Sequence, residues 1–127
     1  MKYGKHLLLE VITKNGKDLA SVAKIKSFFN EIVTKVGFNT VHVPVYYKFP
    51  VRKEGELSGI TGMCILSESH ISIHTWPEKN YFAFDIFSCS KFKENKVLDI
   101  IQEFFDVDVL FSEIRERGLS INFKKRG

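Results

Sequence analysis

The sequence predicts an α+β fold, a two-layer sandwich in which two helices cover one face of a mostly antiparallel sheet. Three observations lead to this prediction. The chain has 127 residues, which suits a single domain over 1–127. Its strand-like runs are short and several follow one another directly, which is typical of antiparallel pairing. Two segments carry apolar residues at helical spacing.

The N-terminal half is expected to form a strand, a helix and a second strand. These elements are predicted over 5–13, 18–36 and 40–49. The first strand would bury Leu7, Leu9 and Val11, which alternate along it. Asp18 is the expected helix N-cap, and Gly37 ends the helical pattern. A proline at position 44 predicts that the second strand lies at a sheet edge.

The C-terminal half is expected to continue as strands with one further helix. An exposed charged loop over 50–59 precedes strands at 60–66, 70–76 and 81–89, then a helix with its apolar face over 97–105, then strands at 107–116 and 119–123. Pro77 ends the fourth strand, and Ser90 is the expected cap of the second helix. Twelve phenylalanines indicate an aromatic core, and the uncovered sheet face is expected to pack on a second subunit.

Composition argues against several classes of protein. No apolar run approaches the ~20 residues that span a bilayer. The apolar stretch before Glu10 is too short for a signal peptide, so we expect a cytoplasmic protein without a membrane partner. The net charge of +4 is mild, and no nucleic-acid partner is expected. Cys64 and Cys89 are expected to be free thiols, and no metal site is predicted.

The stretch LSESHISIHTWPE, from Leu66 to Glu78, is loaded with reactive side chains for a predicted strand. His70 and His74 lie four residues apart, but on a strand this spacing does not make the zinc pair of a helix. A G-x-S-x-G nucleophile elbow and a phosphate-binding glycine loop are both missing from the sequence. The reactive side chains of this stretch therefore indicate a chemistry other than that of a zinc site, a serine hydrolase or a phosphate-binding loop.

The run SGITGMCILSESHISIHTWPE, followed by FAFDIFSC, resembles the prokaryotic S-adenosylmethionine decarboxylases, which are small pyruvoyl-dependent proenzymes. The resemblance is densest from Ser58 to Cys89 and extends more loosely to the opening GKHLLLE. It implies self-cleavage between Glu68 and Ser69, in which the Ser69 hydroxyl attacks the Glu68 carbonyl carbon. The products would be a β chain of residues 1–68 and an α chain that begins with a pyruvoyl group made from Ser69.

The resemblance also implies how such a protein works. A pyruvoyl ketone forms a Schiff base with the substrate's α-amine and takes up the electrons released when CO₂ leaves. Cys89 matches the family's proton donor, and His74 matches the histidine that assists processing. Thr61 matches a position that is serine in relatives and keeps the hydroxyl. Glu78 matches the glutamate that binds the ribose of the substrate.

Further assignments stay open at this stage. Phe49 is a candidate for stacking on a substrate ring, as an aromatic residue does in the family. His70 and Asp85 are divided between a structural role and a place in the site. Along a straight strand Ser69 and His74 would lie roughly 16 Å apart on opposite faces. Either the chain reverses near Ser69, or His74 comes from another subunit; we expect a homodimer with shared sites.

The implied reaction is decarboxylation of S-adenosylmethionine to the aminopropyl donor for spermidine. Two alternatives remain. The first is a pyruvoyl-dependent arginine or ornithine decarboxylase of the same fold, since similar pyruvoyl proteins act on those amino acids. The charged loop over 50–59, which is longer than the connection typical of the family, keeps this alternative open. An unprocessed homologue with a regulatory role is the other possibility.

Overall fold

The computed structural model describes residues 3–118 and forms one six-stranded sheet with two α-helices. The elements in chain order are β1 (Gly4–Thr13), the 3-10 turn η1 (Gly16–Ala20), α1 (Val22–Val36), β2 (Val45–Lys48), β3 (Ile60–Leu66), β4 (Ser69–Trp76), the 3-10 turn η2 (Pro77–Lys79), β5 (Tyr81–Ser88), α2 (Glu94–Phe104) and β6 (Val107–Arg117). The first six predicted strands and both predicted helices are present.

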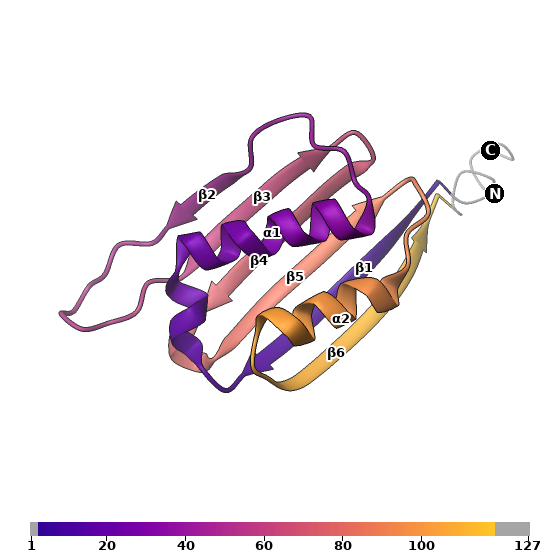
Figure 1. Cartoon of the computed structure of the whole chain (residues 1–127). Coiled ribbons are helices and arrows are strands. Elements are labelled where there is room, and N and C mark those ends of the chain that lie inside the picture. The colour runs from indigo at the N-terminus through magenta and orange to yellow at the C-terminus, as the bar shows by residue number, and fades with distance from the viewer. Residues whose placement is uncertain (1–2, 119–127) are drawn as a thin grey trace, which may run out of the picture.

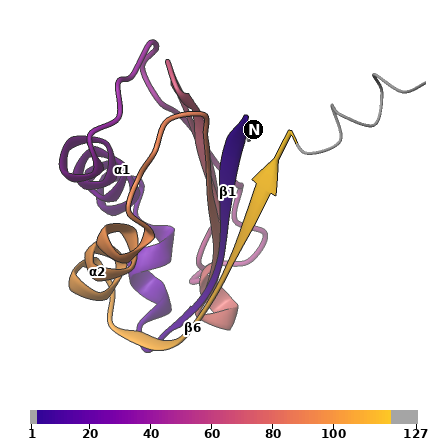
Figure 2. The same ribbon diagram turned by 90° about the vertical axis from the view of Figure 1, so that its right-hand side faces the viewer.

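The strands lie in the order β2-β3-β4-β5-β1-β6, and every neighbouring pair is antiparallel. Both α-helices lie on the same side of the sheet, with α1 over β3 to β5 and α2 over β1 and β6 (Figure 1). Seen edge-on, the two helices leave the opposite side of the sheet without a helical layer (Figure 2). The predicted two-layer α+β sandwich is confirmed, with β2 at the predicted edge position.

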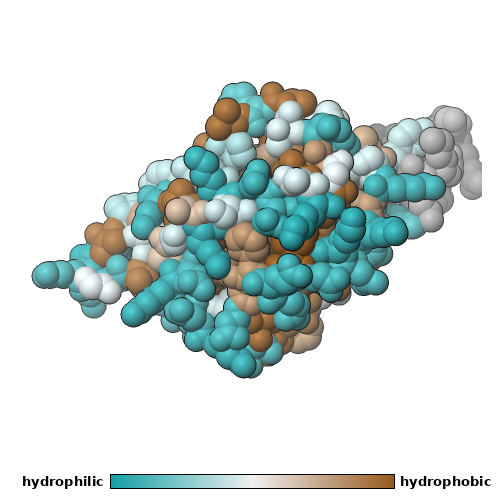
Figure 3. All heavy atoms as spheres, in the orientation of Figure 1, coloured by the Kyte–Doolittle hydropathy of each residue, from teal (hydrophilic) through white to brown (hydrophobic). Residues whose placement is uncertain are grey.

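The core fills the space between the helices and the sheet, and phenylalanine dominates it. Phe28 of α1 is fully buried and packs against Phe82 and Phe84 of β5 and against Phe104 and Phe105 at the end of α2. These ring centroids lie 5.0–6.4 Å apart, within the range of favourable aromatic pairs. The outer surface of the helices is largely hydrophilic (Figure 3), as expected for amphipathic helices.

Several predicted boundaries were wrong by a few residues. Ser21, rather than Asp18, caps α1 by accepting a hydrogen bond from the Lys24 amide, because a 3-10 turn takes up residues 16–20 first. Lys93, rather than Ser90, precedes α2 and gives it no side-chain cap. The second strand is shorter than predicted and keeps only Val45–Lys48. The strand predicted at 119–123 lies outside the described residues.

The uncovered side of the sheet, which we call the open face, carries many exposed apolar side chains. They come from four of the strands: Leu8, Ile12, Val45, Tyr47, Met63, Ile65, Val109 and Phe111. Large exposed apolar patches are uncommon on monomeric proteins and are typical of surfaces that bind another protein, a ligand or a membrane. Within the described chain, neither helix has the length and hydrophobicity needed to cross a membrane.

Candidate active site

The two strands on either side of Glu68-Ser69 form a hairpin whose turn consists of Ser67 and Glu68. Leu66 pairs with Ser69, so the chain reverses at the predicted cleavage site. Ser69 has φ 154°, a backbone conformation that residues with a side chain rarely adopt. The first alternative considered from the sequence, a chain reversal near Ser69, is therefore present.

Hydrogen bonds hold this turn on both sides. The Cys89 amide donates to the Glu68 carbonyl oxygen at 2.9 Å. The Asn39 amide and side chain donate to the Glu68 carboxylate at 3.0 and 2.8 Å, which holds the pKa of that carboxyl below its ordinary value. The Ser67 amide in turn donates to the Asn39 carbonyl at 2.8 Å. Nothing in the sequence pointed to Asn39, which is 29 residues from Glu68 along the chain.

Cys89 follows the end of β5 directly and is exposed, beside the turn that its amide contacts. It lines a cavity of about 260 Å³ together with Lys5, Ser88, Ser90, Lys91, Gly4 and Glu116. Asp85 lines a different cavity. Cys64, the other free thiol, is buried in the core, and burial raises the pKa of its thiol.

Four of the predicted site residues meet at the other end of β4. Thr61 of β3 lies opposite His74 of β4, and the Thr61 hydroxyl is 3.2 Å from Nδ1 of His74. Both line a cavity of about 410 Å³, a volume suited to a small molecule. Phe49 and Glu78 also line this cavity, whose outer wall is the loop over 50–59.

Trp76 is part of the same cavity, although it was not among the residues predicted for the site. It is 40% exposed, and its ring stacks on Tyr81 at 5.2 Å. The signal was available in the alternation of β4, which puts Trp76 on the same face as His74. Its indole and the nearby Phe49 ring provide the cavity with aromatic walls.

The predicted residues therefore fall into two groups at opposite ends of β4. Ser69 is the first residue of the strand, and His74 follows it by five positions. Strand alternation puts Ser69 on the side of Ile71 and Ile73, which are buried under the helices, whereas His74 is exposed on the open face. Within one chain, His74 and Ser69 are roughly 16 Å apart and cannot touch.

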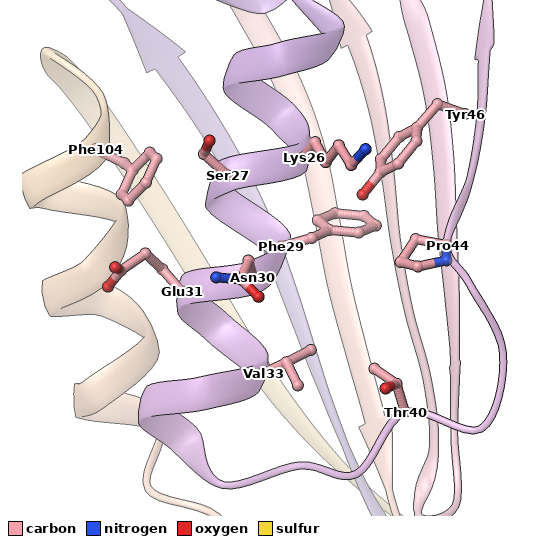
Figure 4. A pocket seen from close by; sticks show the side chains of 10 residues that line it. All are labelled: Lys26, Ser27, Phe29, Asn30, Glu31, Val33, Thr40, Pro44, Tyr46 and Phe104. Atoms are coloured by element: carbon pink, nitrogen blue, oxygen red, sulfur yellow. The ribbon is translucent and has the colours of Figure 1, made fainter.

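Another cavity, of about 560 Å³, lies on the helical side between α1 and the edge strand β2 (Figure 4). None of the predicted site residues lines it. The Tyr46 ring points into the space beside Phe29 (Figure 4), and burial raises the pKa of Tyr46 to about 12. Over residues 3–118 no cluster of three or more His, Cys, Asp or Glu side chains is arranged to hold a metal ion.

Comparison with known proteins identifies one family. Residues 5–118 match the family model described as S-adenosylmethionine decarboxylase. The S-adenosylmethionine decarboxylase proenzyme of Pyrococcus furiosus is 34% identical over 117 residues, which are 91% of this chain and 79% of that protein. The proenzyme of Thermococcus gammatolerans is 36% identical, with coverage of 91% and 77%.

A solved structure agrees with these matches. The crystal structure of the adenosylmethionine decarboxylase from Aquifex aeolicus superposes with a TM-score of 0.79 and 26% identity, covering 93% of this chain and 92% of that one. The resemblance predicted from the motif is confirmed.

Proposed function

The chain belongs to the S-adenosylmethionine decarboxylase family, and we propose that it cuts itself between Glu68 and Ser69 and then decarboxylates S-adenosylmethionine. The product is the aminopropyl donor for spermidine synthesis. An exposed free thiol at Cys89 fits a reducing compartment, so we propose a cytoplasmic enzyme.

The observation that carries the proposal is the geometry of the Glu68-Ser69 peptide. Its carbonyl oxygen accepts a hydrogen bond from the Cys89 amide at 2.9 Å, which polarises the carbonyl carbon for attack. The backbone strain of Ser69, φ 154°, is relieved when the peptide bond breaks. A serine at a tight turn, next to a polarised carbonyl, fits the conversion of Ser69 to a pyruvoyl group.

The chain's own atoms supply the first steps of this conversion. The Ser69 hydroxyl oxygen attacks the Glu68 carbonyl carbon, the C–N bond breaks, and the hydroxyl proton passes to the freed nitrogen, so that an ester replaces the amide. Removal of the Ser69 α-proton then expels Glu68 as a carboxylate and leaves dehydroalanine. Addition of water and loss of ammonia convert that residue to pyruvoyl.

The two resulting chains stay associated because their strands interleave. Residues 1–68 contribute β1, β2, β3 and α1, and residues 69–127 contribute β4, β5, β6 and α2. β1 lies between β5 and β6, so the first chain is hydrogen-bonded to the second on both sides of that strand. Cleavage at 68/69 therefore leaves one folded unit.

A pyruvoyl ketone supplies an acceptor for the electrons released as CO₂ leaves. Cys89, beside the new terminus, holds the proton that returns to the substrate's α-carbon. Glu78 accepts hydrogen bonds from ribose hydroxyls, and the aromatic rings of Phe49 and Trp76 hold the adenine. These aromatic walls favour S-adenosylmethionine over arginine or ornithine, which carry no ring.

We further propose that each active site is shared between two subunits of a homodimer. The Glu68-Ser69-Cys89 group and the Thr61-His74 group lie at opposite ends of β4 in one chain. In the proposed dimer, two open faces pack in antiparallel orientation, so that the Glu68-Ser69 end of β4 in one subunit lies beside the Thr61-His74 end of β4 in its partner. The Ser69 side chain points to the helical side of its own sheet, so it is the backbone of Ser69, with the α-proton, that would face the partner. When Nδ1 of His74 donates to Thr61, its Nε2 is free to accept the Ser69 α-proton of the other chain. The exposed apolar residues of the open face support such packing.

Intact-mass spectrometry of the purified protein tests the cleavage. We expect two chains split at 68/69, the second blocked by pyruvoyl; one full-length chain after long incubation would refute the proposal.

Release of CO₂ from S-adenosylmethionine, arginine and ornithine, measured side by side, tests which compound is the substrate. We expect turnover of S-adenosylmethionine, and a preference for either amino acid would contradict the assignment. In a Cys89→Ser variant, we expect cleavage to continue and CO₂ release to fall.

A further inference from the structure

A cluster of polar side chains lies on the open face, one residue away from the proposed cleavage site. The Asp85 carboxylate of β5 lies 2.8 Å from Nε2 of His6 on β1 and accepts a hydrogen bond from the Ser72 hydroxyl of β4. Its Oδ2 atom also lies 3.7 Å from Nε2 of His70. These side chains are partly shielded from water, with 18% of His6, 24% of Asp85 and 36% of His70 exposed.

His70 has a second set of contacts in the same place. Its ring lies 6.0 Å from that of Phe87, its cross-strand partner on β5, and 6.3 Å from that of His6. The Phe87 ring is covered in turn by the Arg117 guanidinium at 4.6 Å. The His70 side chain is thus held by β5 and β1 rather than by its own strand.

Self-cleavage changes what holds the start of β4. In the uncut chain Ser69 is tethered through the turn to Leu66 of β3. After cleavage that tether is gone, and residue 69 loses its amide N–H because its nitrogen leaves as ammonia. His70 becomes the first residue with a complete backbone and a side chain. Strand ends fray when few contacts hold them, whereas a reacting group must be held closely in place.

We infer that Asp85, held by His6 and Ser72, anchors His70 and thereby fixes the pyruvoyl-bearing end of β4 after cleavage. Asp85 is thus a positioning residue that acts through His70. This inference rests on the proposed function, because only a cut chain has a free end to anchor. It assigns a use to His6, Ser72 and Asp85, which the proposed reaction does not otherwise employ.

Hydrogen–deuterium exchange of the β4 amides tests the anchor independently of turnover. The Asp85→Asn substitution is introduced into the self-cleaving chain and into a Ser69→Ala chain, whose tether stays intact. We expect exchange at the amides of residues 70–72 to rise about 10-fold in the cut Asp85→Asn protein and less than about 2-fold in the uncut one. In the cut protein kcat should fall about 10- to 100-fold with KM nearly unchanged.

The matched control is Glu10→Gln. Like the contact between Asp85 and His6, the Glu10 carboxylate joins β1 to β5: it accepts a hydrogen bond from Tyr81 at 2.7 Å, but far from residue 69. The Glu10→Gln substitution should leave amide exchange at residues 70–72 unchanged in both the cut and the uncut protein. If Asp85→Asn is not cleaved, the same comparison is made with His6→Gln, which removes one support of the carboxylate.

The outcomes separate this inference from the function on which it rests. If Asp85→Asn raises amide exchange equally in the cut and uncut proteins, or in neither, the proposed anchoring of His70 is refuted, but the proposed decarboxylase activity is not. A wild-type chain that stays intact by mass overturns both, because no free strand end is then formed.

Discussion

The two ends of β4 differ in the chemistry they offer, and neither is complete by itself. The first end, at Glu68-Ser69, has a nucleophile, a polarised carbonyl and a thiol, but no base is in contact with the Ser69 α-carbon among the described interactions. The second end has a histidine, a threonine hydroxyl and an aromatic cavity, but no bond to cut. In the proposed homodimer, β4 therefore carries both halves of a site, and each half is used with the complementary half of the other subunit.

The largest expected effect concerns the first end. Ser69→Ala removes the attacking oxygen, so we expect no cleavage and no CO₂ release. Ser67→Ala is the matched control, since Ser67 lies in the same turn and is exposed. Intact-mass measurement reports both variants. Cleavage of Ser69→Ala at 68/69 would show that another group performs the attack.

A smaller effect is expected at the second end. Glu78→Gln removes the charge from a hydrogen-bond acceptor in the 410 Å³ cavity, so KM for S-adenosylmethionine should rise about 10-fold while cleavage proceeds normally. Glu54→Gln changes a carboxylate of the neighbouring loop that does not line the cavity, and it should leave KM unchanged. Steady-state kinetics distinguish the two. An unchanged KM for Glu78→Gln would remove this residue from the site.

The smallest effect concerns the hydrogen bonds from Asn39 to the Glu68 carboxylate. Because Asn39 lowers the pKa of Glu68 in the folded chain, these hydrogen bonds stabilise the protein fully above the ordinary Glu68 pKa of 4.5. This contribution is lost as the pH falls through the lowered folded value. In the uncut Ser69→Ala background, Asn39→Ala should therefore be less stable than its parent at pH 7, and the gap should narrow below pH 4.5. Denaturant unfolding at several pH values measures it; a gap independent of pH would mean that the carboxylate is not involved.

The sequence predicted the fold well because the covered side of the sheet follows simple alternation. Leu7, Leu9 and Val11 are buried as expected, and β3 has the predicted bounds. Local pattern was less able to locate contacts made across the chain. The bond between Asn39 and Glu68 and the contact between His6 and Asp85 join residues 29 and 79 positions apart, and no local signal encodes either.

For the candidate site, too, the sequence motif located residues better than it located their contacts. The motif pointed to Thr61, His74 and Glu78, and the antiparallel pairing of β3 with β4 places them around one cavity. Trp76 was not predicted for the site, although its alternation with His74 puts it on the open face, because large aromatic residues are more often largely buried.

Mixed dimers of Ser69→Ala and His74→Ala subunits test most directly the claim that the two ends of β4 serve different molecules. In such a dimer one site combines the intact Ser69 of the His74→Ala chain with the intact His74 of the Ser69→Ala chain. We expect the His74→Ala chain to stay uncut alone and to be cut at 68/69 when the two variants are co-expressed. An His74→Ala chain that stays uncut in every mixture, or that is cut as fast alone as the wild type, would contradict a shared site.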